Sequence, residues 1–193
     1  MSAASDYPTL SFRSPEEWEE WLDENHDRAA GVWLRMFKKG SGQTSITYAG
    51  ALDVALCYGW IDSQARGLDD VSYVQKFTPR RARSPWSKRN TQHIERLTKA
   101  GRMRPAGLAQ VEAAMRDGRW TSAYDSPSDA TMPEDFLAAL EANAKAKAFF
   151  ATLNKRNTYP IAYRLQSAKR PETRERRIRA IIDMLAKGEK FYP

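Results

Sequence analysis

Cysteine is almost missing from this sequence, since Cys57 is the only one in 193 residues. A single cysteine excludes an intramolecular disulfide and fits a reducing compartment. No segment approaches the ~18 consecutive apolar residues of a membrane-spanning helix, and the opening MSAASDYP lacks the basic and apolar regions of a signal peptide. We therefore expect a soluble cytoplasmic protein without a transmembrane segment.

Histidine is nearly as scarce, and the short motifs of common enzymes are missing. His26 and His93 lie far apart, with no C-x-x-C, H-E-x-x-H or Asp-rich loop near either. Gly40 and Gly42 lack the spacing and the Lys-Ser/Thr of a phosphate loop, and no G-x-S-x-G is present. Cys57 lies in an apolar segment, where a buried thiol is usually inert. We predict no metal ion, no cofactor and no catalytic residue, so that an enzyme is the less favoured reading.

Acidic residues are nearly absent from the middle of the chain. Between Lys76 and Arg104 there are ten Lys or Arg and one acid, Glu95, while the first thirty residues hold eight acids and two arginines. The formal net charge is +7. Guanidinium groups suit phosphate and carboxylate, so the middle segment is a candidate anion site.

The first 85 residues alternate between predicted strands and helices. Strand patterns cover residues 9–12, 31–38, 60–65 and 71–77, the last two forming a hairpin. Ser14-Pro15-Glu16-Glu17 predicts a helix start with a capping box, and the helix should run to about Asn25. Thr47 predicts the cap of a second helix that ends at Gly59.

The residues after Ser87 show helical periodicity almost throughout. Ile94 and Leu97 mark a first helix, and further helices are expected from about 105 to 117, 133 to 140, 144 to 153, 159 to 169 and 171 to 187, with a connector at 120–132. We therefore predict an α+β fold: a small N-terminal β-sheet with two packed helices in residues 1–85, followed by an all-helical half in residues 86–193. The two portions are expected to form one compact unit.

Several segments also resemble a known family. They are F-x-S-x-E-E-W-x-x-W-L near the start, ITYAGALDVALCYGWIDSQ, YVQKFTPRRARSPWSKRN, GRMRPAGL and DGRWTSAYD, which together cover most of residues 12–125. In these and in the RIRAII segment the chain resembles the YdeI/OmpD-associated family of bacteriocin-protection proteins. The resemblance implies association with an outer-membrane porin or tolerance of envelope-directed agents. It implies no cofactor and no catalytic residue.

The candidate site joins the arginine-rich loop to neighbouring aromatic and polar residues. Pro79 and Pro85 interrupt regular structure there, and a helix start near Ser84 or Ser87 would aim free N–H groups at an anion. The arginines and Lys88 would hold the anion, Ser87 and Asn90 would orient it, two tryptophans would form walls, and Asp62 would fix an arginine. The predicted ligand-binding residues are Trp60, Asp62, Arg80, Arg81, Arg83, Trp86, Ser87, Lys88 and Asn90, with Arg102 and Arg104 as outer contributors.

Three alternatives stay open at this stage. The basic residues could instead form structural ion pairs with Asp62, Asp69, Asp70 or the acidic N-terminal helix. Asp62 could be the general base of an uncharacterised enzyme. The same basic surface could bind nucleic acid, although no nucleic-acid-binding motif is present and the acidic N-terminus opposes a general electrostatic grip. The partner is thus an anionic small molecule, a protein or, least favoured, a nucleic acid, and the oligomeric state stays open.

Overall fold

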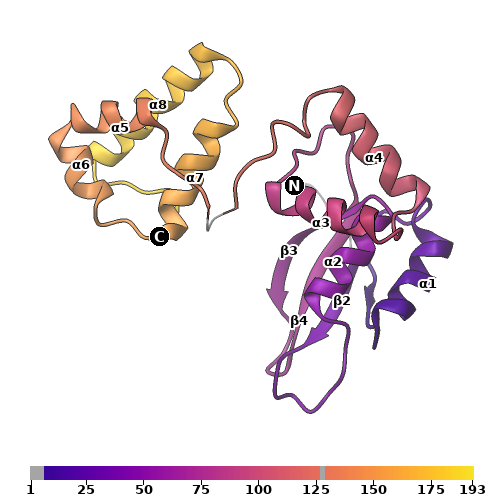
Figure 1. The fold of residues 1–193 in the computed structure, drawn as a ribbon. Coiled ribbons are helices and arrows are strands. Elements are labelled where there is room, and N and C mark those ends of the chain that lie inside the picture. The colour runs from indigo at the N-terminus through magenta and orange to yellow at the C-terminus, as the bar shows by residue number, and fades with distance from the viewer. Residues whose placement is uncertain (1–6, 127–128) are drawn as a thin grey trace. The chain divides into compact units, whose positions relative to one another are not determined.

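The computed structural model describes residues 7–126 and 129–193. By its internal packing the chain divides into two compact units, one of residues 1–86 and 90–122 and the other of residues 87–89 and 123–193. We call them the sheet unit and the helical unit and describe each by itself (Figure 1). Residues 1–6 and two residues of the expected 120–132 connector, 127 and 128, lie outside the described residues.

The sheet unit contains a four-stranded sheet of order β1-β2-β4-β3. Its strands are β1 (Thr9–Leu10), β2 (Val32–Phe37), β3 (Trp60–Gly67) and β4 (Ser72–Pro79). β1 runs parallel to β2, while β2–β4 and β3–β4 are antiparallel. The β3–β4 hairpin has an irregularity between Asp62 and Ala65. The predicted hairpin is confirmed, and the 60–65 strand extends by two residues.

The helices of the sheet unit are α1 (Pro15–Asn25), α2 (Tyr48–Cys57), α3 (Lys88–Lys99) from Asn90 onward and α4 (Pro105–Arg116). Ser14 caps α1 by accepting from the Glu17 N–H, and Thr47 caps α2 by accepting from the Gly50 N–H, as the sequence predicts. The capping box itself is only half right. The Glu17 carboxylate accepts from the N–H of Arg13, 2.7 Å away, instead of from that of Ser14.

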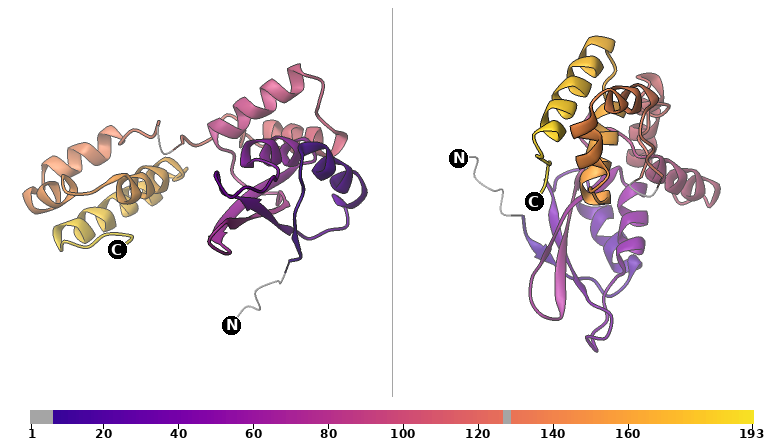
Figure 2. Two further views of the ribbon diagram at one scale, coloured as in Figure 1. Left: turned by 90° about the horizontal axis from the view of Figure 1, so that it is seen from below. Right: turned by 90° about the vertical axis from the view of Figure 1, so that its left-hand side faces the viewer.

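α1 and α2 lie against one face of the sheet (Figure 2), and aromatic side chains pack between α1 and the strands. Trp18 of α1 is fully buried, its ring centroid lies 6.2 Å from that of Trp60 and 6.0 Å from that of Phe77, and its indole N–H donates to the carbonyl oxygen of Ala51. Because side chains alternate along a strand, Ile61, Lys76 and Thr78 point to the opposite face. The site described below lies on that opposite face.

The helical unit contains α5 (Glu134–Glu141), α6 (Ala144–Phe150), α7 (Lys155–Gln166) and α8 (Pro171–Ala186). Its core is built from one aromatic residue and aliphatic residues on all four helices: Phe136, Leu140, Ala146, Ile161, Leu165, Ile178, Ile181, Ile182 and Leu185. The predicted helix from residue 159 in fact begins at Lys155, because the stretch KRNT has no apolar residue to reveal it.

The α+β class, with a sheet first and helices after it, is confirmed. The packing divides the chain after Ser122, whereas the predicted portions meet at residue 86. The difference arises at Gly107 of α4, which lies against the end of α2 so closely that a Cβ there would meet the Cys57 carbonyl oxygen at 2.2 Å. α4 therefore belongs to the sheet unit, although periodicity groups it with the later helices.

Candidate functional site

The arginine-rich loop between β4 and α3 is folded around a buried tryptophan. Trp86 is 2% exposed, and the Arg80 guanidinium lies 3.6 Å from the centroid of its ring. Arg80 also donates to the carbonyl oxygen of Pro85 at 2.7 Å, and Arg119 donates to that of Ser84 at 3.0 Å. Arg80, itself 6% exposed, is thus part of the structural support of this loop.

A hollow of about 530 Å³ opens beside this loop on the sheet face opposite α1 and α2. Its lining combines three cations and four hydroxyl-bearing side chains with apolar residues: Tyr7, Ala30, Ile61, Ser63, Lys76, Thr78, Pro79, Arg80, Arg81 and Ser84. We call it the sheet-face hollow. No Asp or Glu is among its lining residues. Cations and hydroxyl donors without a carboxylate are the groups that hold phosphate or carboxylate in proteins.

Two of the three cations that line the sheet-face hollow, Lys76 and Arg80, lie over aromatic rings. The Lys76 ammonium lies 4.6 Å from the ring centroid of Tyr7 and 5.8 Å from that of Trp33, and the Arg66 guanidinium covers Trp33 at 4.4 Å. Within the described part of the chain, neither Lys76 nor Arg81 forms an ion pair. Their charge is therefore available to an anion.

Two of the nine predicted site residues, Arg80 and Arg81, line this hollow. Trp60 and Asp62 belong to the covered face: the Trp60 indole donates to the carbonyl oxygen of His26, and the Asp62 carboxylate accepts from the Tyr48 hydroxyl at 2.7 Å. Trp60 is 1% exposed, so it packs in the core, and Asp62 is bound to the Tyr48 hydroxyl instead of to an arginine.

The remaining predicted residues are spread along the loop and the start of α3. Arg83 is exposed, Ser87 pairs with Tyr124 in an isolated bridge, and Asn90 is half-buried in the first turn of α3. Lys88 forms a 2.6 Å ion pair with Asp125, whose pKa is lowered mainly by this bond. The structure therefore does not gather the nine residues into one cavity.

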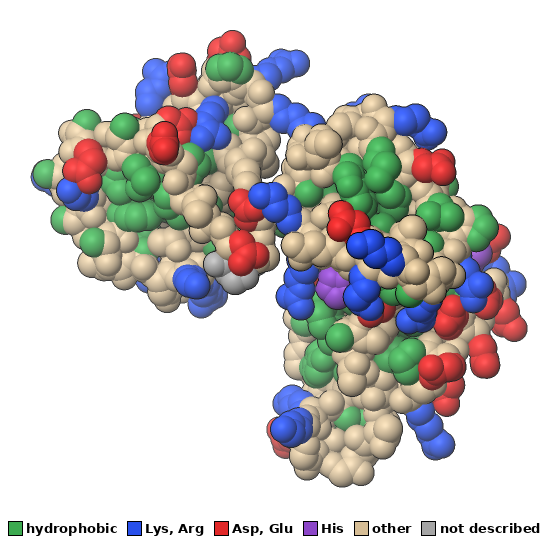
Figure 3. All heavy atoms as spheres, in the orientation of Figure 1, with side chains coloured by type: hydrophobic (Ala, Val, Ile, Leu, Met, Phe, Trp, Pro, Cys, Tyr) green, Lys and Arg blue, Asp and Glu red, His purple; other side chains and the backbone are tan. Residues whose placement is uncertain are grey.

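The outer contributors Arg102 and Arg104 have a structural partner on the acidic helix. They lie 3.5 and 2.8 Å from the carboxylate of Glu19. Figure 3 shows Asp and Glu side chains gathered over α1 with Lys and Arg among them. The expected pairing of basic residues with the acidic N-terminal helix is thus present for these two arginines.

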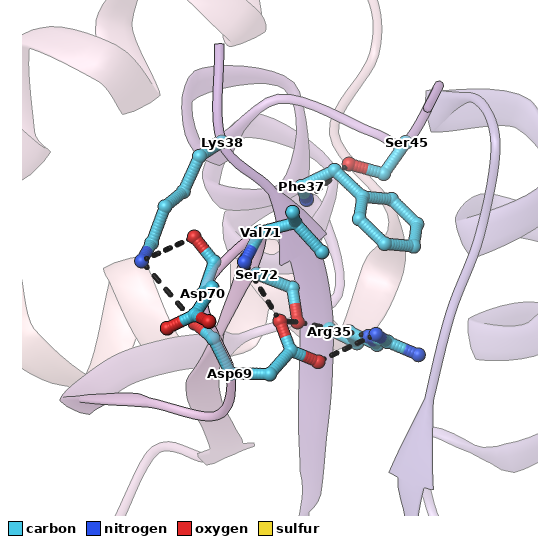
Figure 4. A network of polar contacts seen from close by, with 8 residues as sticks. All are labelled: Arg35, Phe37, Lys38, Ser45, Asp69, Asp70, Val71 and Ser72. Atoms are coloured by element: carbon cyan, nitrogen blue, oxygen red, sulfur yellow. Dashed lines mark hydrogen bonds and ion pairs between the residues drawn. The ribbon is translucent and has the colours of Figure 1, made fainter. Parts of the chain in front are cut away.

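Asp69 also has a partner, but not one from the arginine-rich loop. As Figure 4 shows, its carboxylate contacts Arg35 at 2.7 Å and accepts from the Ser72 hydroxyl and the Val71 N–H. Lys38 donates to the carbonyl oxygens of Asp69 and Asp70. The Ser72 hydroxyl is the main cause that lowers the pKa of Asp69. This network pins the β3–β4 turn against β2.

Lys76, Thr78 and Ser63 were missed by the sequence prediction, which followed the density of arginines. The alternation in β4 would have placed Lys76 and Thr78 on one face, and the β3–β4 pairing brings Ile61 opposite Thr78. No sequence signal brings Tyr7 to them, because it approaches through the parallel pairing of β1 with β2.

A second polar cluster joins α2 to α3. The Asp53 carboxylate lies 2.7 Å from His93 Nδ1 and 2.6 Å from Arg96. Burial opposes the charged form, but the hydrogen bonds from Arg96 and His93 outweigh it and lower the pKa of Asp53. Nearby, burial raises the pKa of the Cys57 thiol to about 11, so this thiol is not an activated nucleophile.

Replacing Asp53 by Asn should destabilise the protein at pH 7 by about 1 to 3 kcal/mol, because Arg96 and His93 lose a charged acceptor. Since the folded pKa of Asp53 is lowered, the wild-type advantage should be present above the unfolded pKa of ~3.9 and be lost as pH falls through the folded value. Thermal unfolding of both proteins from pH 7 to pH 2 measures the difference in stability between the wild type and Asp53→Asn. Asp27→Asn, at an exposed position, is the control, and a gap that persists at pH 2 contradicts the role of Asp53.

Across residues 7–126 and 129–193, His, Cys, Asp and Glu side chains nowhere gather in a set of three that could hold a metal ion. In the same ranges no helix is both long and apolar enough to cross a membrane.

Two family models match the chain in succession. Residues 10–110, just over half of the chain, match the family described as Domain of unknown function (DUF8412), and the protein belongs to that family. Residues 129–188 match the family described as Bacteriocin-protection, YdeI or OmpD-Associated. Comparison with curated proteins and with solved structures gave no match.

The predicted resemblance to the YdeI/OmpD-associated family is confirmed, and the match lies in the helical unit. The quoted motifs lie mostly in residues 12–125, within or just beyond the segment of the other match. The sheet-face hollow and the α5–α8 core therefore fall under different family descriptions.

Proposed function

We propose that this protein is a non-catalytic binding protein and that its sheet unit binds an anionic group of the phosphate or carboxylate type in the sheet-face hollow. The observation that carries the proposal is a hollow with Lys76, Arg80 and Arg81 in its lining and no acid. Thr78 and Ser84 add hydroxyl donors, and the Tyr7 ring offers an apolar wall.

The proposed site includes fewer of the residues that the sequence predicted. Arg80 and Arg81 remain as ligand-binding residues, and Lys76 joins them. Trp86 holds Arg80 in position, because the Arg80 guanidinium stacks on the Trp86 ring. Lys88, Arg102 and Arg104 already have carboxylate partners, so a ligand would have to compete with Asp125 or Glu19 for them.

The family resemblance suggests the biological setting. We propose that binding serves tolerance of envelope stress, as the bacteriocin-protection description of the related proteins implies, and that the protein acts in the cytoplasm. Bacteria that express the wild-type protein should survive a bacteriocin challenge better than bacteria that express Arg81→Ala at the same level. Equal survival of the two strains would show that anion binding in the sheet-face hollow plays no part in tolerance of the bacteriocin.

Thermal unfolding with a panel of phosphates, nucleotides, polyphosphate and sugar acids tests the binding proposal. A ligand that binds only the folded state raises the unfolding midpoint with its concentration. At least one anion should stabilise the wild type, and Arg81→Ala should weaken its binding about tenfold, because a charge-assisted contact is lost.

Arg83→Ala is the matched control, since it removes the same charge from the same loop but not from the hollow. It should change the affinity less than about twofold, because an exposed charge that does not touch the ligand is screened by solvent and salt. Equal losses in both variants would show a general electrostatic effect. Stabilisation by no anion would leave the hollow without a ligand and contradict the proposal.

Nucleic acid is a second candidate ligand, and one feature of the sheet face favours it. Trp33 is covered by Arg66 and flanked by Lys76 on the same face as the hollow, so cations continue along the sheet. A shift with short DNA or RNA that weakens steeply with salt would favour this candidate. A turnover screen against phosphoesters with Asp62→Asn tests the enzyme alternative, which the Tyr48–Asp62 bond on the covered face does not favour.

A further inference from the structure

The helical unit contains a pocket of its own, formed by α7 and the chain end. It measures about 580 Å³, within the ~300–1,000 Å³ of small-molecule sites. Besides Pro160, its lining consists of three cations and three tyrosines: Lys155, Arg156, Arg164, Tyr159, Tyr163 and Tyr192. We call it the α7 pocket. No acidic residue lines it, and all of its lining residues belong to the helical unit.

The walls of the α7 pocket are preformed. Five lining residues from Arg156 to Arg164 repeat at three- and four-residue spacing and so share one face of the helix. The chain end is fixed against α7, since the Tyr192 N–H donates to Oδ1 of the buried Asn157 at 3.0 Å. The Arg164 guanidinium lies 4.2 Å from the ring centroid of Phe191. A ligand would therefore meet an ordered wall on both sides.

The charges of the α7 pocket lack a counterpart. Lys155 and Arg156 occupy the first turn of α7, where the helix dipole disfavours cations, and the cap residue Asn154 makes no side-chain capping bond. Within residues 7–126 and 129–193, none of the three pocket cations forms an ion pair with a carboxylate. An anion in the pocket would remove both unfavourable features.

The tyrosines define the rest of the ligand. The ring centroids of Tyr159 and Tyr163 lie 6.2 Å apart, and Tyr124 and Tyr163 form a T-shaped pair with centroids 4.9 Å apart, which restricts the Tyr163 ring. The Tyr159 hydroxyl donates to the carbonyl oxygen of Asp125 at 3.4 Å, so this residue offers its ring to a ligand. Arg156 and Arg164 are eight residues, or about 12 Å, apart along the helix, with the rings between them. The pocket thus places an aromatic surface between two cationic ends.

We propose that the α7 pocket binds a small aromatic anion, that is, a planar ring bearing a phosphate or carboxylate. The ring stacks on the tyrosines, and the charged group contacts Arg156 and Lys155 at one end or Arg164 at the other. This site is separate from the sheet-face hollow in residues and in unit, and its ligand is defined by a ring as well as by charge.

Isothermal titration of the whole protein with 1-naphthyl phosphate tests the proposal. We expect saturable binding, at least about tenfold weaker binding of 1-naphthol or inorganic phosphate alone, and a further loss of about tenfold or more in Arg156→Ala/Arg164→Ala. Tyr192→Ala, which removes an exposed wall residue, should weaken binding of the naphthyl ring but not that of phosphate.

Arg176→Ala/Arg179→Ala is the matched control, because it removes two charges from α8 outside the pocket. It should keep wild-type affinity. Lys76 lines the sheet-face hollow and not the α7 pocket, so binding in the α7 pocket should be insensitive to Lys76→Ala. If Lys76→Ala abolishes binding, the ligand occupies the sheet-face hollow instead. The proposal for the α7 pocket is also contradicted if the protein does not bind 1-naphthyl phosphate, or if both double variants lose affinity equally.

Discussion

Gly107→Ala should destabilise the sheet unit by about 3 kcal/mol or more, at the upper end of what overpacking costs. A Cβ at this position would lie 2.2 Å from the carbonyl oxygen of Cys57 and 2.9 Å from that of Leu56. Both atoms belong to the backbone at the end of α2, so no side-chain rotation can relieve the overlap. α4 would have to move away from α2.

Tryptophan fluorescence during thermal unfolding measures this effect, because every tryptophan is in the sheet unit. The midpoint should fall by roughly 10 °C or more. Gly67→Ala is the control, since nothing lies within 4 Å of the added methyl group, and it should be neutral or slightly stabilising. An unchanged midpoint for Gly107→Ala would contradict the close approach of α4 to α2.

Phe136→Ala should destabilise the helical unit by about 3 to 5 kcal/mol, because it removes an aromatic side chain that is fully buried in that core. A unit of this size has a total stability of only ~5 kcal/mol, so most of its cooperative structure should be lost near physiological temperature. Circular dichroism at 222 nm should show an early, separate loss of helix. The tryptophan-monitored transition of the sheet unit should keep its midpoint.

Leu137→Ala provides the comparison for this variant. Leu137 is the next residue on α5 but is 41% exposed, so its loss should cost under about 0.5 kcal/mol. If Phe136→Ala lowers the unfolding midpoint seen by tryptophan fluorescence as much as the midpoint seen by circular dichroism, the two units unfold together. The division after Ser122 would then not separate two independently stable units.

Local sequence signals predicted most of the elements of this fold. The caps Ser14 and Thr47 fix where α1 and α2 begin, and alternation predicts the β3–β4 hairpin. The α4 placement could not be predicted, because the fit of Gly107 against Cys57 is a contact between residues fifty positions apart. A glycine inside a helix gives no indication of which backbone it approaches.

The candidate site was predicted less well, for a related reason. The density of positive charge pointed to the loop beside the hollow, and Arg80 and Arg81 of that loop line it. Charge density cannot tell which basic residues have partners: Lys88 pairs with Asp125 and Arg104 with Glu19. Those pairings depend on the tertiary fold. The same holds for Lys76, whose place beside Tyr7 follows from the order of the strands.

The most direct test of the anion site is a titration of the ¹⁵N-labelled protein with pyrophosphate, followed by two-dimensional NMR. Binding in the sheet-face hollow predicts the largest, saturable shifts at the backbone amides of Lys76, Thr78, Arg81 and Ser84. The same titration of Arg81→Ala should show those shifts weakened. Shifts confined to Lys88, Arg102 or Arg104, or absent from the hollow at saturating ligand, would contradict the account.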